Sequence, residues 1–378
     1  MRLLIILSLF SVIYGCKTDT KSISDKRVAE VSKKILIKYA RGFTIEQFKN
    51  YKIITLKNAW KNEKQTHKYV LYSSEKPKGI NNAVFVKTPI KRIACMSLTH
   101  VAFIEKLNLE KSIIALSGCS YVSSIKINDL ISINSIKEIG KVPGINYELL
   151  VEQDPDILMA FGINKNSNNH IKKLRSLGLN VVLNSEYMEV HPLGKAEWIK
   201  FIAAFYDENE KAVAIFDSIE RSYLELLKIV KMVEVKPTVF TGMPWKGAWH
   251  VPGSNSFQAH LFKDAGATYL WGNDNDTISS VVKSKEIIID EAIESDYWLN
   301  LNSYTSLASV IAYDEKFKKF KSIKEQKLFN NDKALNNKLG NDYWESGIIN
   351  PHIILKDLIK IFHPELIEHE LYYYRKLN

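Results

Sequence analysis

The stretch that decides the fold is Asp154-Pro155-Asp156-Ile157-Leu158-Met159-Ala160. A short apolar run that follows turn residues predicts a strand. Residues 147–153, just before it, have the apolar spacing of a short helix. A helix that leads into an apolar strand is typical of an α/β protein with a parallel sheet.

The same alternation continues on both sides of this stretch. We predict further strands at 92–96, 113–116 and 180–183, and further helices at 101–107 and 170–176. Strands that alternate with helices indicate parallel βαβ units. Residues 87–207 are therefore expected to form a first α/β lobe.

A stretch without Gly or Pro follows this lobe. Apolar residues recur at helical spacing from Asn209 to about Val233, after a shorter amphipathic helix at 195–205. At 1.5 Å per residue the longer helix would span roughly 35 Å, about the width of a small domain. We predict one rigid interlobe helix over residues 208–235.

The α/β pattern then restarts, and residues 236–378 are assigned to a second lobe. Its expected strands are 237–241 and 297–301, and its expected helices are 257–264, one ending near Ser295, and 353–362. In front of the first lobe, residues 29–86 have short alternating runs at 35–39, 51–56 and 69–72. Such runs joined by polar turns predict a small N-terminal β extension.

The chain begins with one positive charge and a short apolar run that ends at Gly15. The run is shorter than the ~20 apolar residues that span a bilayer, so residues 1–15 are predicted to be a cleaved signal peptide. Ile13-Tyr14-Gly15-Cys16 resembles the lipobox of bacterial lipoproteins, which makes Cys16 the expected site of lipid attachment. Residues 16–28 would be a polar tether, and the protein would lie in the periplasm or cell envelope. The alternative is an ordinary secretory signal that contains a cysteine.

Composition limits the possible partners. The formal net charge is +10, but the lysines are scattered and no nucleic-acid-binding motif is present, so no nucleic-acid partner is expected. The basic surface could instead attract anionic ligands or lipid headgroups. No second apolar segment is long enough to span a membrane. The remainder of the chain is therefore expected to be soluble. We also expect a monomer.

Cysteine and histidine placement gives no metal-site pattern. Cys95 and Cys119 either pair in an oxidising compartment or stay as buried free thiols. Their spacing is typical of neither a zinc nor an iron–sulfur site, and no cofactor is predicted. Ser97 and His100 are close in sequence, but there is no Gly-x-Ser-x-Gly motif and no placed acid. We therefore predict that the protein is not an enzyme.

Several stretches together resemble one family. Residues 139–150 run from a glycine through a short loop to an Asn-x-Glu helix start, and Pro155-Asp156 opens the apolar strand. Residues 91–103, Trp271 and 342–345 have counterparts too. Over roughly residues 87–365 the chain resembles the class III periplasmic binding proteins, the substrate-binding subunits of ABC importers for ferric siderophores, haem and cobalamin. The resemblance implies two Rossmann-like α/β lobes, one long rigid helix between them, and a ligand in the cleft between the lobes.

The resemblance also implies which residues contact ligand and transporter. The cleft would be lined by residues in the turns after strands, where aromatic rings can stack on a flat ligand: Met96, Ser97, His100, Tyr121, Phe161, Trp245, Trp249, Tyr304, Tyr343 and Trp344. Either tryptophan of the 243–249 loop could instead pack locally. Family members dock on the permease through one acid on each lobe. Glu148 matches the first, unless it only favours its helix start, and Asn255 stands where the second acid is expected.

These expectations combine into one functional hypothesis. A lipid-anchored binding protein would capture an iron complex, in first place a ferric siderophore, and deliver it to an ABC permease with its ATPase. Cobalamin or haem are the alternative ligands in the same role. A scavenging surface lipoprotein without a permease, and an enzyme on the same fold, are alternatives of other classes.

Overall fold

The computed structural model describes residues 33–378 except 62–64, 163–164, 275 and 339. The predicted signal peptide, Cys16 and the tether lie outside the described residues. Residues Val31–Asn378 form one compact unit. None of the helices in the described residues is long and apolar enough to cross a bilayer.

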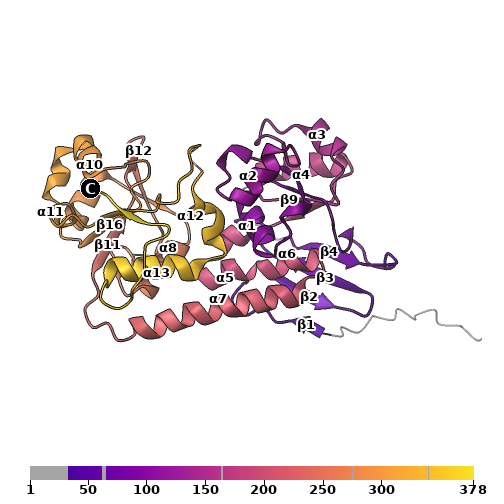
Figure 1. Cartoon of the computed structure of the whole chain (residues 1–378), viewed down its shortest axis with the longest axis horizontal. Helices are drawn as coiled ribbons and strands as arrows, with labels where there is room; N and C mark the ends of the chain where they lie inside the picture. The colour runs from indigo at the N-terminus through magenta and orange to yellow at the C-terminus, as the bar shows by residue number, and fades with distance from the viewer. Residues whose placement is uncertain (1–32, 62–64, 163–164, 275, 339) are drawn as a thin grey trace, which may run out of the picture. The chain divides into compact units, whose positions relative to one another are not determined.

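The N-terminal lobe is built on a five-stranded parallel sheet in the order β10-β9-β6-β7-β8. Strands β6, β9 and β10 are entirely buried, which explains their uniformly apolar sequences. The predicted βαβ pattern is confirmed here, and four helices connect the strands (Figure 1). The elements are β6 Ile93–Cys95, α1 Leu98–Lys106, β7 Ile113–Leu116, α2 Ile125–Ser132, β8 Lys137–Glu138, α3 Tyr147–Glu152, β9 Ile157–Ala160, α4 Lys165–Ser176 and β10 Val181–Leu183.

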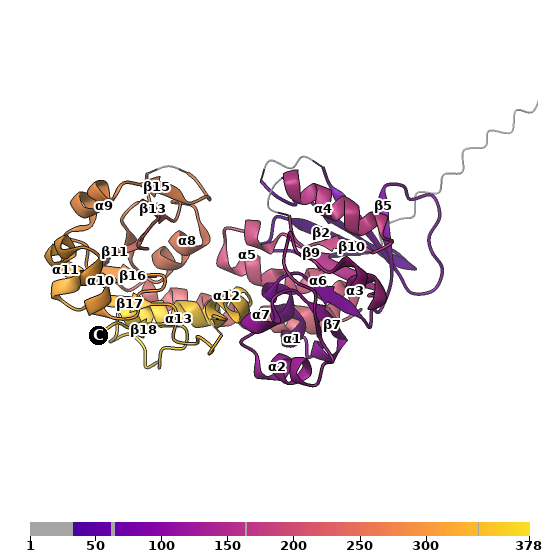
Figure 2. The same cartoon turned by 90° about the horizontal axis from the view of Figure 1, so that it is seen from above.

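The C-terminal lobe has a second sheet in the order β14-β11-β16-β17-β18, parallel except for the edge strand β18. Helices α10 and α11 lie on the side of this sheet away from the N-terminal lobe, and α8 and α12 lie on the side toward it (Figures 1 and 2). A small antiparallel sheet, β12-β13-β15, belongs to the same lobe. The elements are β11 Thr238–Thr241, β12 Pro244–Trp245, β13 Ala248–Val251, α8 Phe257–Asp264, β14 Thr268–Tyr269, β15 Val281–Lys283, α9 Lys285–Ala292, β16 Tyr297–Leu299, α10 Leu307–Tyr313, α11 Lys321–Lys324, β17 Leu328–Asn330, α12 Asp342–Glu345, α13 Pro351–Phe362 and β18 Arg375–Lys376.

Three helices connect the lobes: α5 Pro192–Glu197, α6 Ile199–Phe205 and α7 Asn209–Val230. The long helix packs on α6 and on α13, and thus contacts helices from both halves of the chain (Figure 1). It ends at Val230, earlier than predicted, because the apolar side chains beyond it have no surface to pack on: Met232 and Val235 are more than 80% exposed. The single helix predicted at 195–205 is in fact two helices that meet at Trp198, and the first begins at Pro192 under a cap from His191.

The N-terminal extension is a sheet in the order β1-β2-β3-β4-β5, antiparallel except for the last pair. Its inner face packs aromatic rings against α6, with Phe43 on Trp198 and Tyr69 on Phe205. The predicted strand at 35–39 is wrong beyond Ile35, and two strands were not predicted, β2 and β5. The elements are β1 Lys33–Ile35, β2 Phe43–Gln47, β3 Tyr51–Leu56, β4 His67–Tyr72 and β5 Ala83–Lys87.

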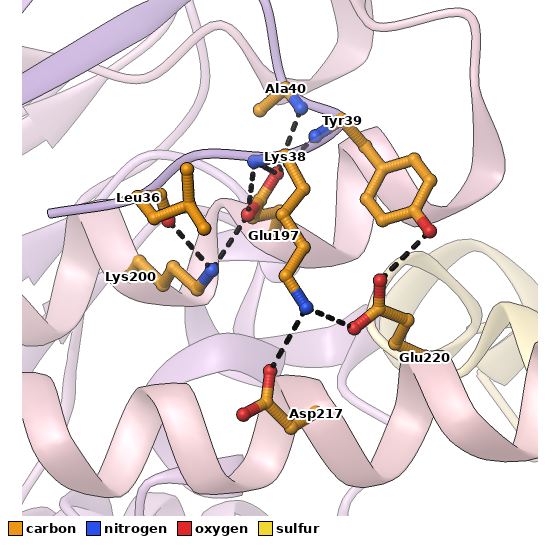
Figure 3. Close-up of polar contacts among 8 residues, drawn as sticks. All are labelled: Leu36, Lys38, Tyr39, Ala40, Glu197, Lys200, Asp217 and Glu220. Atoms are coloured by element: carbon orange, nitrogen blue, oxygen red, sulfur yellow. Dashed lines mark hydrogen bonds and ion pairs between the residues drawn. The ribbon is translucent and has the colours of Figure 1, made fainter.

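A buried carboxylate explains why residues 36–40 are not a strand (Figure 3). Glu197, at the end of α5, accepts hydrogen bonds from the backbone N–H groups of Lys38, Tyr39 and Ala40 at 2.7–3.0 Å. It also pairs with the buried Lys200 at 2.7 Å. The backbone N–H groups of this segment thus donate to a side chain of the interlobe helices and not to the carbonyl groups of a neighbouring strand. This fixes the extension to the rest of the protein.

Candidate ligand-binding cleft

A cavity of about 410 Å³ lies in the N-terminal lobe. Its walls come from the turns after β6, β7 and β9, which all end at the same edge of the parallel sheet. Ligands of open α/β sheets bind at this carboxyl edge. The lining is mostly apolar and includes the ring of Tyr121, over which the ammonium of Lys141 sits 3.6 Å from the centroid. Such a cation over an aromatic face also suits contact with a flat anionic ligand.

A cavity of about 600 Å³ lies at the equivalent edge of the C-terminal lobe. It is more polar, because asparagines follow β16 and β17. Asn300 and Asn302 both have φ near +57°, a left-handed conformation that asparagine tolerates better than most residues. Trp344, 58% exposed, is the large aromatic side chain of this wall.

A third cavity, of about 440 Å³, has walls from three parts of the chain. Residues 187–190 come from the N-terminal lobe, Lys195 from the connecting helix α5, and Pro252, Phe257 and Trp344 from the C-terminal lobe. Lys61 of the β extension completes it and donates a hydrogen bond to Ser279 Oγ at 3.0 Å. Because Trp344, Pro252, Gln258 and Ser280 line this cavity and the C-terminal one, the two cavities are neighbours.

Lys195 is the buried cation of this third cavity. Burial lowers the pKa of its ammonium to about 8, against the opposing pull of Glu186 and Glu189. Its Nζ donates to the Tyr187 carbonyl at 3.0 Å and lies 5.1 Å from the centre of the Phe257 ring. The connecting helix α5 thus presents a cation directly to an aromatic ring of the C-terminal lobe.

Hydrogen bonds also join the lobes beside Tyr121. The carboxylate of Glu345, at the end of α12, accepts from the N–H groups of Ser123 and Ser124 at 2.7 and 3.3 Å. The side-chain amide of Asn336 donates to the Val122 carbonyl at 2.7 Å. Glu345 is almost fully buried, and this burial raises its pKa to about 7. Hydrogen bonds therefore hold the N-terminal and C-terminal lobes together next to the cavity that Tyr121 lines.

Residues 93–335 match the sequence model of the family described as periplasmic binding protein, which is more than half of the chain. The chain belongs to the periplasmic binding protein family. Proteins of this kind bind small solutes for ABC transporters, which consist of a permease and an ATPase, and they are not enzymes. The predicted family and the prediction that the chain is not an enzyme are confirmed.

Two relatives of this binding protein are named uncharacterized lipoproteins of Methanocaldococcus jannaschii. The first is 24% identical over 385 residues, which cover 96% of this chain and 89% of the relative. The second is 24% identical over 412 residues, and the alignment covers all of this chain and all of the relative. Both alignments include the N-terminal part of the chain as well as the two lobes.

Solved structures share the fold of this binding protein at low identity. A possible iron-binding (periplasmic solute-binding) protein of Staphylococcus epidermidis has a TM-score of 0.58 and 18% identity, over 73% of this chain and all of that chain. A periplasmic haem-binding protein of Roseiflexus has a TM-score of 0.56 and 13% identity, over 74% and 100%. An Fe³⁺-hydroxamate transport protein of Saccharomonospora viridis has a TM-score of 0.54 and 16% identity, over 73% and 94%. These likenesses confirm the predicted two-lobed α/β fold.

The structure brings five of the predicted cleft residues to the cavities of the binding protein. Met96, Ser97, Tyr121 and Phe161 share the N-terminal cavity, and Trp344 lines the other two. Whether they contact a ligand stays a prediction. Lys61, Lys141 and Lys195 also line cavities and were not predicted, because single lysines in this lysine-rich sequence carry no distinguishing pattern.

Three predicted cleft residues lie in the core, and for these the prediction is wrong. Trp249 is fully buried, stacks on Trp298 and donates to the Thr241 carbonyl, because strand alternation turns it inward. Tyr343 is 3% exposed and packs on Tyr373 and Tyr374. His100 is fully buried in α1, and burial lowers its pKa to about 3, so its imidazole is neutral.

Two further predicted residues lie outside the three cavity linings. Trp245 is 62% exposed on β12, with the Lys246 ammonium 4.6 Å from its ring. Tyr304 is partly buried against Tyr313 in an edge-to-face contact. The two cysteines of the described chain, Cys95 and Cys119, are buried and free, so the thiol alternative holds in this structure.

The two predicted docking positions are at the surface. Glu148 is exposed in the first turn of α3, which Asn146 caps by accepting from the Leu149 N–H. Asn255 is held between two side chains: its amide nitrogen donates to Asp276 Oδ1 at 2.7 Å, and its oxygen lies 2.8 Å from His260 Nε2. Asp276 is itself exposed, so an acid lies beside the position where one was expected.

Proposed function

We propose that this solute-binding protein is anchored through a lipid on Cys16 and captures an iron complex, in first place a ferric siderophore, for delivery to an ABC permease. The observation that carries the proposal is the pair of cavities at the carboxyl edges of the two sheets, one lined by Tyr121 and Phe161 and the other by Trp344. Aromatic faces with a few polar and cationic groups suit a planar complex that brings its own metal ligands.

The lipid anchor is supported by sequence and by relatives. Cys16 ends a segment with the features of a lipoprotein signal, and two relatives aligned over nearly the whole chain are named lipoproteins. Mass spectrometry of the protein from its own membrane tests this directly. A diacylglyceryl mass on the peptide that begins at Cys16 is expected, and an unmodified Cys16 would contradict it.

The ligand is tested by tryptophan fluorescence. Ferric hydroxamate and ferric catecholate complexes, haem and cobalamin are each titrated into the protein. A ferric siderophore is expected to quench the emission at micromolar concentrations or below, and Trp344→Phe should remove much of the signal because Trp344 lines the cavities. Trp245→Phe is the matched control, since Trp245 is equally exposed but lies outside the linings. Quenching only by haem or cobalamin would change the ligand, and no quenching by any of them would refute an iron-complex receptor.

Docking to the permease is proposed to use Glu148 on one lobe and Asp276 on the other. Asp276 supplies the charge that Asn255 lacks, because the two side chains are hydrogen-bonded and Asp276 is exposed. Exposed carboxylates at these two places would pair with arginines of a permease. Scavenging without a permease is the alternative that fails if these acids prove necessary for uptake.

A further inference from the structure

Basic residues are distributed unevenly along the chain. Residues 33–87, which form the β extension, contain 13 Lys or Arg and 3 Asp or Glu, a formal net charge of +10. The whole chain also has a net charge of +10, so the remaining residues hold 39 basic and 39 acidic groups. The extension is a strongly basic unit on an otherwise neutral receptor.

Few of these charges are neutralised by the rest of the protein. Lys38 pairs with Asp217 and Glu220, and Lys52 pairs with Asp207, so these two face the interlobe helices. Lys34 has Glu46 at 3.7 Å. Eight further basic side chains are exposed, and within the described part of the chain none of them forms an ion pair with a carboxylate: Arg41, Lys49, Lys57, Lys61, Lys68, Lys76, Lys78 and Lys87. Of these, Lys61 donates to the Ser279 hydroxyl of the C-terminal lobe.

Several of these lysines share the outer face of the sheet. Tyr69, Leu71 and Val86 are buried toward the receptor, and alternation along the strands places Lys68 and Lys87 on the opposite face. Tyr72, Phe85 and Ile53 lie on that same outer face by the register of β3, β4 and β5.

The loop between β4 and β5 also lies against this face. The ammonium of Lys76 is 4.3 Å from the centre of the Phe85 ring, which places the loop that carries Lys76 and Lys78 over the outer side of the sheet. Lysine stems and aromatic rings together are the composition of surfaces that lie at a boundary between water and lipid.

The extension is also the part of the folded unit that comes first after the proposed anchor. Sixteen residues, 17–32, lie between Cys16 and Lys33. Over the resulting 17 steps a fully extended chain spans at most about 3.4 Å per step, or roughly 60 Å in total. A lipid on Cys16 would therefore keep β1 within that distance of the bilayer. A lipid anchor is commonly supplemented by a second, basic signal that contacts anionic headgroups.

We propose that the outer face of the β extension binds the anionic lipid surface of the membrane and sets the orientation of the receptor on it. The proposal uses the lipid anchor of the proposed function only to bring the sheet near the bilayer, and the contact itself is electrostatic. Because Glu197 holds residues 38–40 on the interlobe helices, orientation of the sheet is passed to both lobes (Figure 3). The proposal is independent of which ligand the cavities take.

The test uses the chain from Lys17 onward, which carries no lipid and keeps every residue of the compact unit. It is sedimented with vesicles of phosphatidylcholine alone or with phosphatidylglycerol added, at low and high salt. Binding is expected only to the anionic vesicles and should be lost at high salt, because screening shortens the reach of surface charges. Since each lysine near an anionic surface contributes roughly fivefold in affinity, Lys68→Glu/Lys76→Glu/Lys87→Glu should weaken binding by about 100-fold or more.

A matched control makes the same charge change on the C-terminal lobe, at three exposed lysines within residues 316–324. Lys316→Glu/Lys319→Glu/Lys324→Glu should leave vesicle binding within about threefold of the unchanged chain. Equal loss in this control, or equal binding to neutral vesicles, would overturn the proposal. Ligand titration of the same variants separates the two proposals, because ligand affinity should be unchanged whether or not the vesicles are bound.

Discussion

Replacement of Glu197 by alanine should destabilise the protein more than the loss of a surface ion pair, because it leaves buried hydrogen-bond donors without their acceptor. The carboxylate is fully buried and accepts from three backbone N–H groups and from Lys200 (Figure 3). After Glu197→Ala the ammonium of Lys200, 3% exposed, keeps the Leu36 carbonyl at 3.1 Å and the Phe216 ring, 4.4 Å from its centroid. The perturbation therefore leaves a buried charge without a carboxylate in direct contact.

The magnitude follows from known costs of this kind. Removing one partner of a buried ion pair costs about 3–5 kcal/mol. Unfolding entropy of about 2.1 cal/mol/K per residue, over roughly 350 residues, gives about 0.7 kcal/mol/K. A loss of about 4 kcal/mol should then lower the Tm by about 5 °C.

The assay is scanning calorimetry together with amide hydrogen exchange at residues 38–40. Glu220→Ala is the matched control, since its carboxylate bonds to Lys38 and Tyr39 of the same segment but pairs with a lysine that is 37% exposed. A partly solvated ion pair contributes about 1 kcal/mol or less to stability. Glu220→Ala should therefore lower the Tm by only about 1–2 °C.

A second variant keeps the result interpretable. Glu197→Ala/Lys200→Met should recover part of the loss, because the unpaired charge is gone while the buried volume is kept. Faster exchange of the 38–40 amides is expected in both variants. A Tm within about 1 °C of the unchanged protein for Glu197→Ala, with unchanged exchange, would refute the view that this carboxylate fixes the extension.

Two other predictions concern the contact between the lobes and the contact with a permease. Burial raises the pKa of Glu345 to about 7, so the folded protein keeps a proton that the unfolded chain releases near pH 4.5; stability should fall as the pH rises between these values, by up to about 3 kcal/mol. Glu345→Gln should flatten this part of a plot of Tm against pH, and an unchanged slope would show that another group is responsible. Glu148→Arg and Asp276→Arg should each reduce uptake of the ligand at least about tenfold while its affinity for the receptor is unchanged, because reversed charges repel permease arginines. If neither change reduces uptake, the protein does not dock on a permease through Glu148 and Asp276, and the alternative of a scavenging lipoprotein gains support.

Much of the fold was predictable because the signals are local. Ile113–Leu116 and Phe257–Asp264 are a strand and a helix with the predicted bounds, since apolar runs and Ser caps act within a few residues. Strand β2 was missed because Phe43–Gln47 is short and its apolar residues alternate with polar ones. Strand β5, Ala83–Lys87, was missed although its first four residues are apolar, because so short a run is a weak signal on its own. Their place in a sheet depends on neighbours that are distant in sequence.

The candidate site was predictable only in part. The turns after β6, β7 and β9 could be located from the strands, and the cavity residues there, Met96 to Phe161, follow from that. In the 243–249 loop the sequence offered two tryptophans without telling them apart. The pairing of β12 with β13 turns Trp249 into the core and leaves Trp245 exposed.

The sequence by itself determined the alternation of strands and helices, the long helix Asn209–Val230 and the basic character of residues 33–87, because periodicity and charge are properties of neighbouring residues. Tertiary structure alone decided which charged and polar side chains have partners and which remain exposed to solvent. Glu197 meets backbone groups about 157–159 residues away, and Asn255 finds Asp276 through a loop. Contacts of this range follow from how the chain packs its apolar core, and no local pattern records them.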